Sequence, residues 1–200
     1  MIKVLLILAI CFNTADSWAG KILFKNAIGL TPGKTTKQRL TQLFGKPDKI
    51  NNFKDARARQ SWEYRENGTE RITFFFDEGS EVAHSLVWEM RSDDPEKDLK
   101  VAKAQFPSAT WEIESTKWIN PHALPAECFY KDKKQGISLE LNLRRREVYR
   151  ITRWNPERAL ASEEGSKPPM FCLDAGCSPA IPASEFFKDN SVEKYCDEVH

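Results

Sequence analysis

Alternating apolar and polar positions dominate the middle of the chain and predict two groups of β-strands. Before each group, apolar residues recur at spacings of three and four, which is typical of a short amphipathic helix. The first helix is expected to begin after Thr35 as its N-terminal cap and to end at Gly45. Its apolar stripe is formed by Leu40, Leu43 and Phe44.

Three strands are predicted after this helix, over residues 61–66, 71–76 and 82–90. In the middle strand Ile72, Phe74 and Phe76 share one face, as expected for a half-buried strand. Asn67-Gly68 is a hairpin-turn signal, so neighbouring strands should run antiparallel.

The second group follows the same plan. Asp94 is expected to cap a helix that starts at Pro95 and carries Leu99, Ala102 and Phe106 on one side. The strands that follow are predicted over residues 111–118, 128–131, 137–143 and 148–154.

The two groups align at one offset of 66 residues, which matches Tyr64 with Tyr130, Val82 with Val148 and Trp88 with Trp154. We interpret this as an internal duplication. Chance agreement between two β-meanders is the alternative. Under the duplication, both Trp88 and Trp154 are expected in the core.

These elements predict an α+β fold with two tandem helix-plus-antiparallel-meander units, residues 20–92 and 93–155. Residues 156–200 form a cysteine-containing extension whose first part, 163–169, has a linker composition. A disulfide-clipped, packed extension is expected, and a disordered tail is the alternative.

The N-terminus pairs Lys3 with a short apolar run and ends in a small-x-small site at Ser17 and Ala19. Residues 1–19 are therefore a predicted signal peptide, and the mature protein is expected in the periplasm or outside the cell. Cys11 could be a lipidation site, but bulky Ile10 stands where a small residue is required. Membrane attachment is expected only if Cys11 is lipidated.

Four cysteines remain after this cleavage: Cys128, Cys172, Cys177 and Cys196. An even number in an exported chain predicts two disulfides, for which three pairings are open. Cys172–Cys177 with Cys128–Cys196 is favoured. The histidines are scattered, so neither a metal site nor a cofactor is expected.

The formal net charge is +1, which gives no reason to expect a nucleic-acid partner. The chain has no Gly-x-Ser-x-Gly nucleophile motif, and no catalytic residues are assigned. A thiol enzyme using Cys128 and His122, or a small hydrolase, is the less favoured alternative to a non-enzymatic protein.

A candidate binding surface combines two tryptophans with the densest basic cluster: Trp111, Trp118, Arg144, Arg145 and Arg146. Aromatic residues and arginine dominate many protein interfaces. Core packing for the tryptophans and a solvated turn for the arginines are the structural alternatives.

Residues 32–47 (PGKTTKQRLTQLFGKP) with Trp62-Glu-Tyr64 and Ile72–Phe76 resemble the SmpA/OmlA (BamE-like) envelope domain over about residues 32–90. The resemblance implies a non-catalytic protein-binding module that assists outer-membrane protein assembly or envelope integrity. If duplicated, the chain also resembles the β-lactamase inhibitory protein-like fold, which binds through its concave sheet. An inhibitor of a secreted or periplasmic enzyme is therefore the alternative function, with another envelope or secreted protein as partner in either case.

Overall fold

The computed structural model describes residues 27–53, 59–66, 70–90, 94–115, 118–119, 127–158, 170–173, 176–186, 192 and 195–196. The predicted signal peptide with Cys11, the Asn67-Gly68 turn and the 163–169 linker lie outside these residues.

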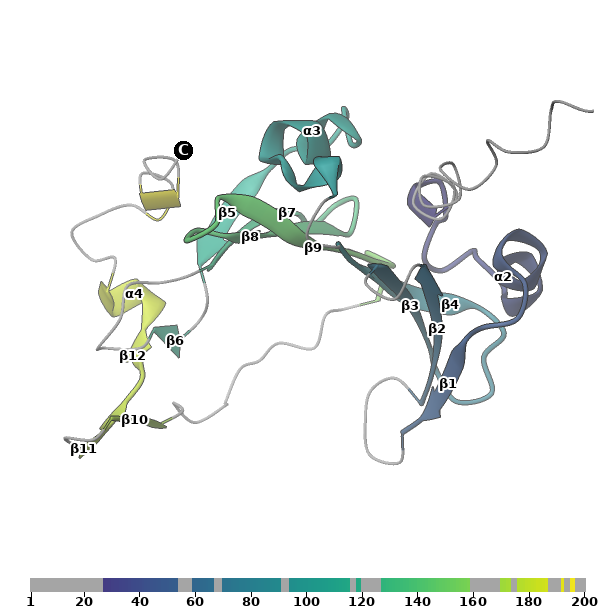
Figure 1. Ribbon diagram of the computed structural model, residues 1–200, viewed down its shortest axis with the longest axis horizontal. Coiled ribbons are helices and arrows are strands. Elements are labelled where there is room, and N and C mark those ends of the chain that lie inside the picture. The colour runs from purple at the N-terminus through teal and green to yellow at the C-terminus, as the bar shows by residue number, and fades with distance from the viewer. Residues whose placement is uncertain are drawn as a thin grey trace, which may run out of the picture.

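One eight-stranded antiparallel sheet forms the centre of the protein (Figure 1). Its strands, in spatial order, are β1 (Lys49–Asn52), β2 (Gln60–Glu66), β3 (Glu70–Phe76), β4 (Ala83–Glu89), β9 (Glu147–Trp154), β8 (Ile137–Asn142), β7 (Glu127–Asp132) and β5 (Glu112–Ser115). The protein is thus mostly β with few short helices. The two predicted meanders do not form separate sheets, because β4 and β9 pair edge to edge.

The smaller elements are the helical segments, the short strand β6 between β5 and β7, and the elements of the C-terminal part. They are α2 (Lys37–Phe44), the 3-10 turn η1 (Pro95–Lys97), α3 (Leu99–Ala104), β6 (Trp118–Ile119), β10 (Met170–Leu173), β11 (Gly176–Pro179), β12 (Ile181–Pro182) and α4 (Ala183–Phe186). Strand β5 ends at Ser115 in the main sheet, whereas β6 pairs with β12 in another sheet, so the prediction of one continuous strand over 111–118 was wrong.

Helix α2 begins one residue later than predicted. The hydroxyl of Thr36, not Thr35, accepts the N–H of Arg39, while the Thr35 hydroxyl donates to the carbonyl of Thr31. The Gly45 end is confirmed: its φ of 78° is left-handed, and its N–H donates to the carbonyl of Thr41.

The core lies between the sheet and the two helices, which are on the outer side of the bent sheet in Figure 1. Leu40 of α2 is fully buried, and the ring of Phe44 packs against Tyr64 and Phe74. In the other half Ala102 and Phe106 cover β9 and its neighbours. The alternating pattern of β3 is confirmed, because Ile72, Phe74 and Phe76 are buried.

Trp154 does not share the position of Trp88. The Cα register places Trp88 opposite Ile151 on the helix side, whereas Trp154 lies opposite Ser85. Its neighbour Arg153 faces the helices, since its guanidinium donates to two carbonyls of the 27–30 segment and lies over the Phe106 ring. Because successive side chains alternate, Trp154 points to the other face of the sheet. Trp154 is buried as predicted, at 8% exposed, but it lies outside the main core cluster. The prediction that it occupies the same position as Trp88 was wrong.

The predicted Cys128–Cys196 disulfide is confirmed, with a Cα–Cα distance of 6.1 Å. Both cysteines are fully buried, so the bond ties the C-terminal region to β7 beneath the surface. In the β10–β11 hairpin the register places Cys172 directly opposite Cys177. The second disulfide remains a prediction.

Tyr64 gives the core a pH dependence. Burial and then the charge of Asp48 raise the pKa of Tyr64 to about 12. The phenol of the unfolded chain ionises near pH 10, so the folded state loses stability as the pH rises from about 10 to 12. We expect wild type to lose about 2 kcal/mol more than Tyr64→Phe over this range. Urea unfolding at successive pH values measures this difference, and parallel curves for the two proteins would contradict it.

Candidate functional site

The face of the sheet that the helices leave open carries one row of mostly charged side chains. Strand register brings together one residue from each of seven strands: Arg65, Arg71, Glu89, Arg150, Glu140, Phe129 and Glu114. We call these residues the charged row. The row crosses the β4–β9 junction, so both halves of the protein contribute to it.

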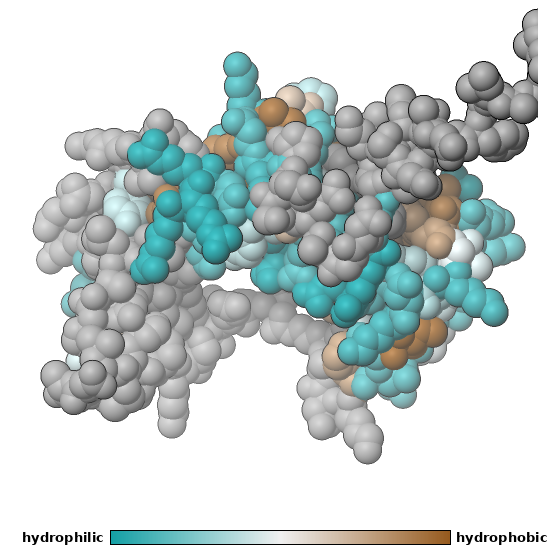
Figure 2. Space-filling model, in the orientation of Figure 1, coloured by the Kyte–Doolittle hydropathy of each residue, from teal (hydrophilic) through white to brown (hydrophobic). Residues whose placement is uncertain are grey.

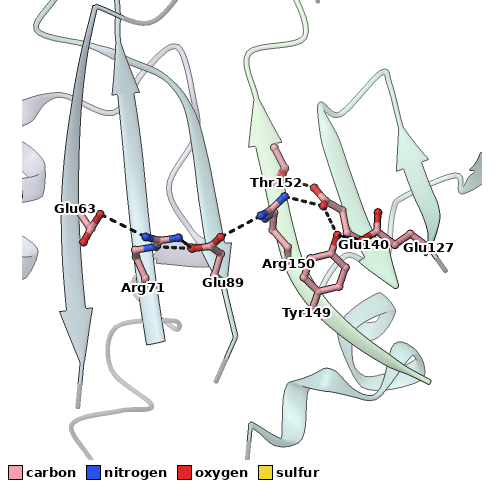
Figure 3. A network of polar contacts seen from close by, with 8 residues as sticks. All are labelled: Glu63, Arg71, Glu89, Glu127, Glu140, Tyr149, Arg150 and Thr152. Carbon is pink, nitrogen blue, oxygen red and sulfur yellow. Dashed lines mark hydrogen bonds and ion pairs between the residues drawn. The ribbon is translucent and has the colours of Figure 1, made fainter. Parts of the chain in front are cut away.

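Arg150 joins the two halves at the centre of the row (Figure 3). Its Nη2 lies 3.1 Å from Glu89 Oε1 on β4, and its Nη1 lies 3.0 Å from Glu140 Oε2 on β8. Glu89 also pairs with Arg71 on β3, and Arg71 lies 3.8 Å from Glu63 on β2. One unbroken chain of ion pairs thus spans five strands.

Tyr149 extends this network to β7. Its hydroxyl lies 3.1 Å from both Glu127 Oε1 and Glu140 Oε2, and it can donate its single proton to one of them at a time. Burial, followed by the charges of these two carboxylates, raises the pKa of Tyr149 well above its ordinary value. Tyr149 therefore stays a neutral donor. Thr152 donates to the other oxygen of Glu140 over 3.3 Å.

The carboxylates lie deeper than the arginines that cover them. The side chains of Glu63 and Glu140 are only 6% and 12% exposed, whereas those of Arg65 and Arg71 are 50% and 41% exposed. Each guanidinium is held by a carboxylate below it and keeps donors free for a ligand above. The most exposed side chains of the row on β2–β9 are therefore guanidinium groups fixed in position, although arginines and glutamates balance in number within this network.

The β5–β7 end of the face has a different charge pattern. Lys131 and Lys133 lie 2.6 and 2.7 Å from the carboxylate of Glu114. Burial would raise the pKa of Glu114, but these two hydrogen bonds outweigh it and hold the pKa below its usual value. This end is locally neutralised.

Aromatic side chains lie on the same face, two rows away from the charged row. Register places Phe75, Ser85 and Trp154 side by side across β3, β4 and β9. The rings of Phe75 and His84 are 6.5 Å apart. The pKa of His84 is lowered by burial and by the charge of Arg158, which favours a neutral ring. Trp154 is only 8% exposed, so Phe75 and His84, both half-buried, are the rings that this row offers beside the arginines. Aromatic residues and arginine dominate binding energy at many protein interfaces.

The structure does not bring the five predicted surface residues together. Trp111 packs against Phe106 at the start of β5, and β6, which contains Trp118, lies outside the main sheet. The three arginines form the exposed β8–β9 turn, where the backbone N–H groups of Arg144 and Arg145 donate to Asn142. Trp111 and this turn lie at opposite ends of β8. The charged row was not predicted from the sequence. Its residues do alternate with the apolar positions that were used to predict the strands, and this alternation was the available signal.

Cys128 cannot act as a thiol nucleophile in this structure, because it is fully buried and bonded to Cys196. His122, its suggested base, lies outside the described residues. Within the described ranges, no group of histidine, cysteine and acidic side chains has metal-binding geometry. No helix in the same ranges is long and apolar enough to cross a membrane.

No protein-family model and no curated protein sequence matches this chain. Among solved structures, it is similar to a DUF4309 family protein, YjgB, from Bacillus subtilis subsp. subtilis str. 168. That similarity has a TM-score of 0.38 and 16% sequence identity, and it covers 68% of this chain and 95% of YjgB.

Proposed function

We propose that this protein is an exported, non-catalytic binding module that docks another envelope or secreted protein on the open face of its sheet. The observation that carries the proposal is the charged row, in which buried carboxylates hold exposed arginines in place. Preorganised donors lose little conformational entropy when a partner binds, so such a face suits recognition of carboxylates. The proposed partner therefore presents an acidic surface.

The predicted signal peptide and an even cysteine count support a location in the periplasm or outside the cell. The resemblance of residues 32–90 to the SmpA/OmlA domain supports the proposal that the protein acts in the bacterial envelope. There it would assist outer-membrane protein assembly or envelope integrity. Membrane attachment would depend on Cys11. Membrane fractionation of wild type and Cys11→Ala tests this, because lipidation predicts that only the variant is released.

We also infer that the two halves arose by duplication. Both four-stranded halves follow a helix, and both Tyr64 and Tyr130 are buried in corresponding strands. In this interpretation, the joined open face belongs to both copies, and a partner spans them.

Photo-crosslinking tests the docking face. A crosslinking amino acid at Thr73, which neighbours the charged row, should capture the partner in envelope preparations, whereas the same group at the exposed Gln42 of α2 should not. Mass spectrometry of the product separates two functions. If the captured partner is a component of outer-membrane protein assembly, the result supports a role in assembly. If it is a hydrolase, the result supports the alternative that the protein is an enzyme inhibitor. Equal products from both positions would reject the open face as the docking site.

Charge reversal gives a quantitative prediction for the captured partner. Arg65→Glu is expected to weaken binding by about tenfold or more, because it places a negative charge where an acidic partner docks. Arg39→Glu on α2, also exposed, is the matched control and should leave affinity unchanged. Isothermal titration measures both, and circular dichroism confirms folding. Equal losses in the two variants would mean that only net charge matters.

A further inference from the structure

The outer edge of β1 is a second surface on which another chain can pair. Strand β1 ends the sheet, and no other described strand lies beside it. The N–H of Phe53 donates over 2.9 Å to the carbonyl of Arg59, the residue before β2. Hydrogen-bonded positions alternate along an antiparallel ladder, so the N–H and C=O groups of Ile50 and Asn52 point outward. Such an edge is a template for an added strand.

Apolar side chains are exposed along the same edge. Ile50 is 49% and Phe53 38% exposed, and they are two of three large hydrophobic residues exposed in the described ranges. Figure 2 shows apolar surface among hydrophilic residues in the region where Figure 1 places β1. Phe53 also lines a groove of about 420 Å³, whose charged lining residues balance: Lys37, Arg59, Asp77 and Glu78. An added strand could place one apolar side chain in this groove.

The charge around this edge indicates which kind of added strand it would attract. Residues 34–53 contain five basic residues and one acidic residue, although the whole chain is close to neutral. Lys46 and Lys49 are exposed, and none of the described carboxylates forms an ion pair with them. Two copies of this basic edge would repel one another, so self-association is disfavoured. An acidic strand would be attracted.

We propose that the outer edge of β1 binds an extended acidic segment of another protein by strand addition. The segment pairs its backbone with Ile50 and Asn52, and it places its apolar side chains on the sheet face where Ile50 lies. Its carboxylates lie beside Lys46 and Lys49. Backbone hydrogen bonds provide affinity in this mode, and side-chain contacts provide specificity. Strand β1 contributes no residue to the charged row, so this surface is distinct from it.

A labelled octapeptide of alternating glutamate and valine tests the proposal by fluorescence anisotropy. Wild type should bind it, and a peptide N-methylated on alternate residues should not bind because it cannot donate to β1. Ile50→Ala and Ile50→Pro form the decisive pair. Both remove the isoleucine side chain, but only proline removes the outward N–H. We expect Ile50→Pro to bind about tenfold more weakly than Ile50→Ala.

Hydrogen exchange of the wild-type protein gives a second measurement that does not depend on the folding of the proline variant. The peptide should slow exchange at the amides of Ile50 and Asn52. Lys49→Glu should weaken binding about tenfold, and the loss should shrink at high salt. Equal binding of the N-methylated peptide, unchanged exchange at both amides, or binding only to phosphatidylglycerol vesicles would overturn the proposal. The last outcome would identify a lipid-binding surface.

Discussion

Replacing Cys128 and Cys196 together by alanine is expected to lower the free energy of unfolding by about 4 kcal/mol. The bond joins residues 68 positions apart, so it removes many conformations from the unfolded chain. Both cysteines are fully buried, and alanine leaves no unsatisfied polar group in their place. Urea unfolding measures the loss. Limited proteolysis should also cut the C-terminal region earlier in the variant.

Cys172→Ala/Cys177→Ala is the matched control for this experiment. If these cysteines are bonded as predicted, their short loop limits the entropic contribution to about 2 kcal/mol. The first pair should therefore cost more stability than the second. Equal losses would mean that the unfolded state retains structure around the longer loop, and no loss in the control would argue against the second disulfide.

Gly136→Ala is expected to destabilise the protein by about 2–5 kcal/mol. Gly136 adopts φ 64° in the β7–β8 turn, a left-handed conformation that costs alanine about 1–2 kcal/mol. A Cβ atom there would lie 2.1 Å from the carbonyl oxygen of Trp154. This oxygen belongs to the backbone of β9, so the turn or the strand end must shift.

Gly79→Ala separates the two causes. Gly79 also has a positive φ, 68°, but nothing lies within 4 Å of its added Cβ. It should lose only the conformational part, about 1–2 kcal/mol. The difference between the two variants in urea unfolding then reports the contact with Trp154. If both variants lose the same stability, the β7–β8 turn can move away from β9 without cost.

Local patterns identified most of the strands and both helical segments. The alternation in residues 72–76 and the apolar stripe around Leu40 are local patterns. They can be recognised without knowing which strands pair with one another. The N-terminal cap was displaced by one residue because Thr35 and Thr36 carry the same hydroxyl. The choice between them depends on the bond from Thr35 to Thr31.

The error at Trp154 has a physical cause in β9. The register between β8 and β9 shifts so that Leu141 pairs with Val148 while Glu140 pairs with Arg150. Tyr149 is the extra residue of this bulge. An extra residue reverses which side chains face the core, so a pattern counted from Val148 puts Trp154 on the wrong face.

The charged row could not be located from sequence for a similar reason. Glu89 and Arg150 meet only because β4 pairs with β9, a contact between residues 61 positions apart. The alternation of apolar and polar residues indicates that both side chains point away from the core. It does not indicate which strands are neighbours in the sheet. The predicted surface relied on local density of arginine and tryptophan, and the fold disperses those residues.

The β4–β9 junction also has a consequence for synthesis. The first four strands of the sheet end at Glu89, and their neighbour β9 begins only at Glu147. During translation β4 is therefore an unpaired edge until the second half has been made. We expect pairing of β4 with β9 to be a late step in folding, since the two meanders contain only nearby contacts. Until that step, the half-made chain is open to pairing with β4 of another molecule.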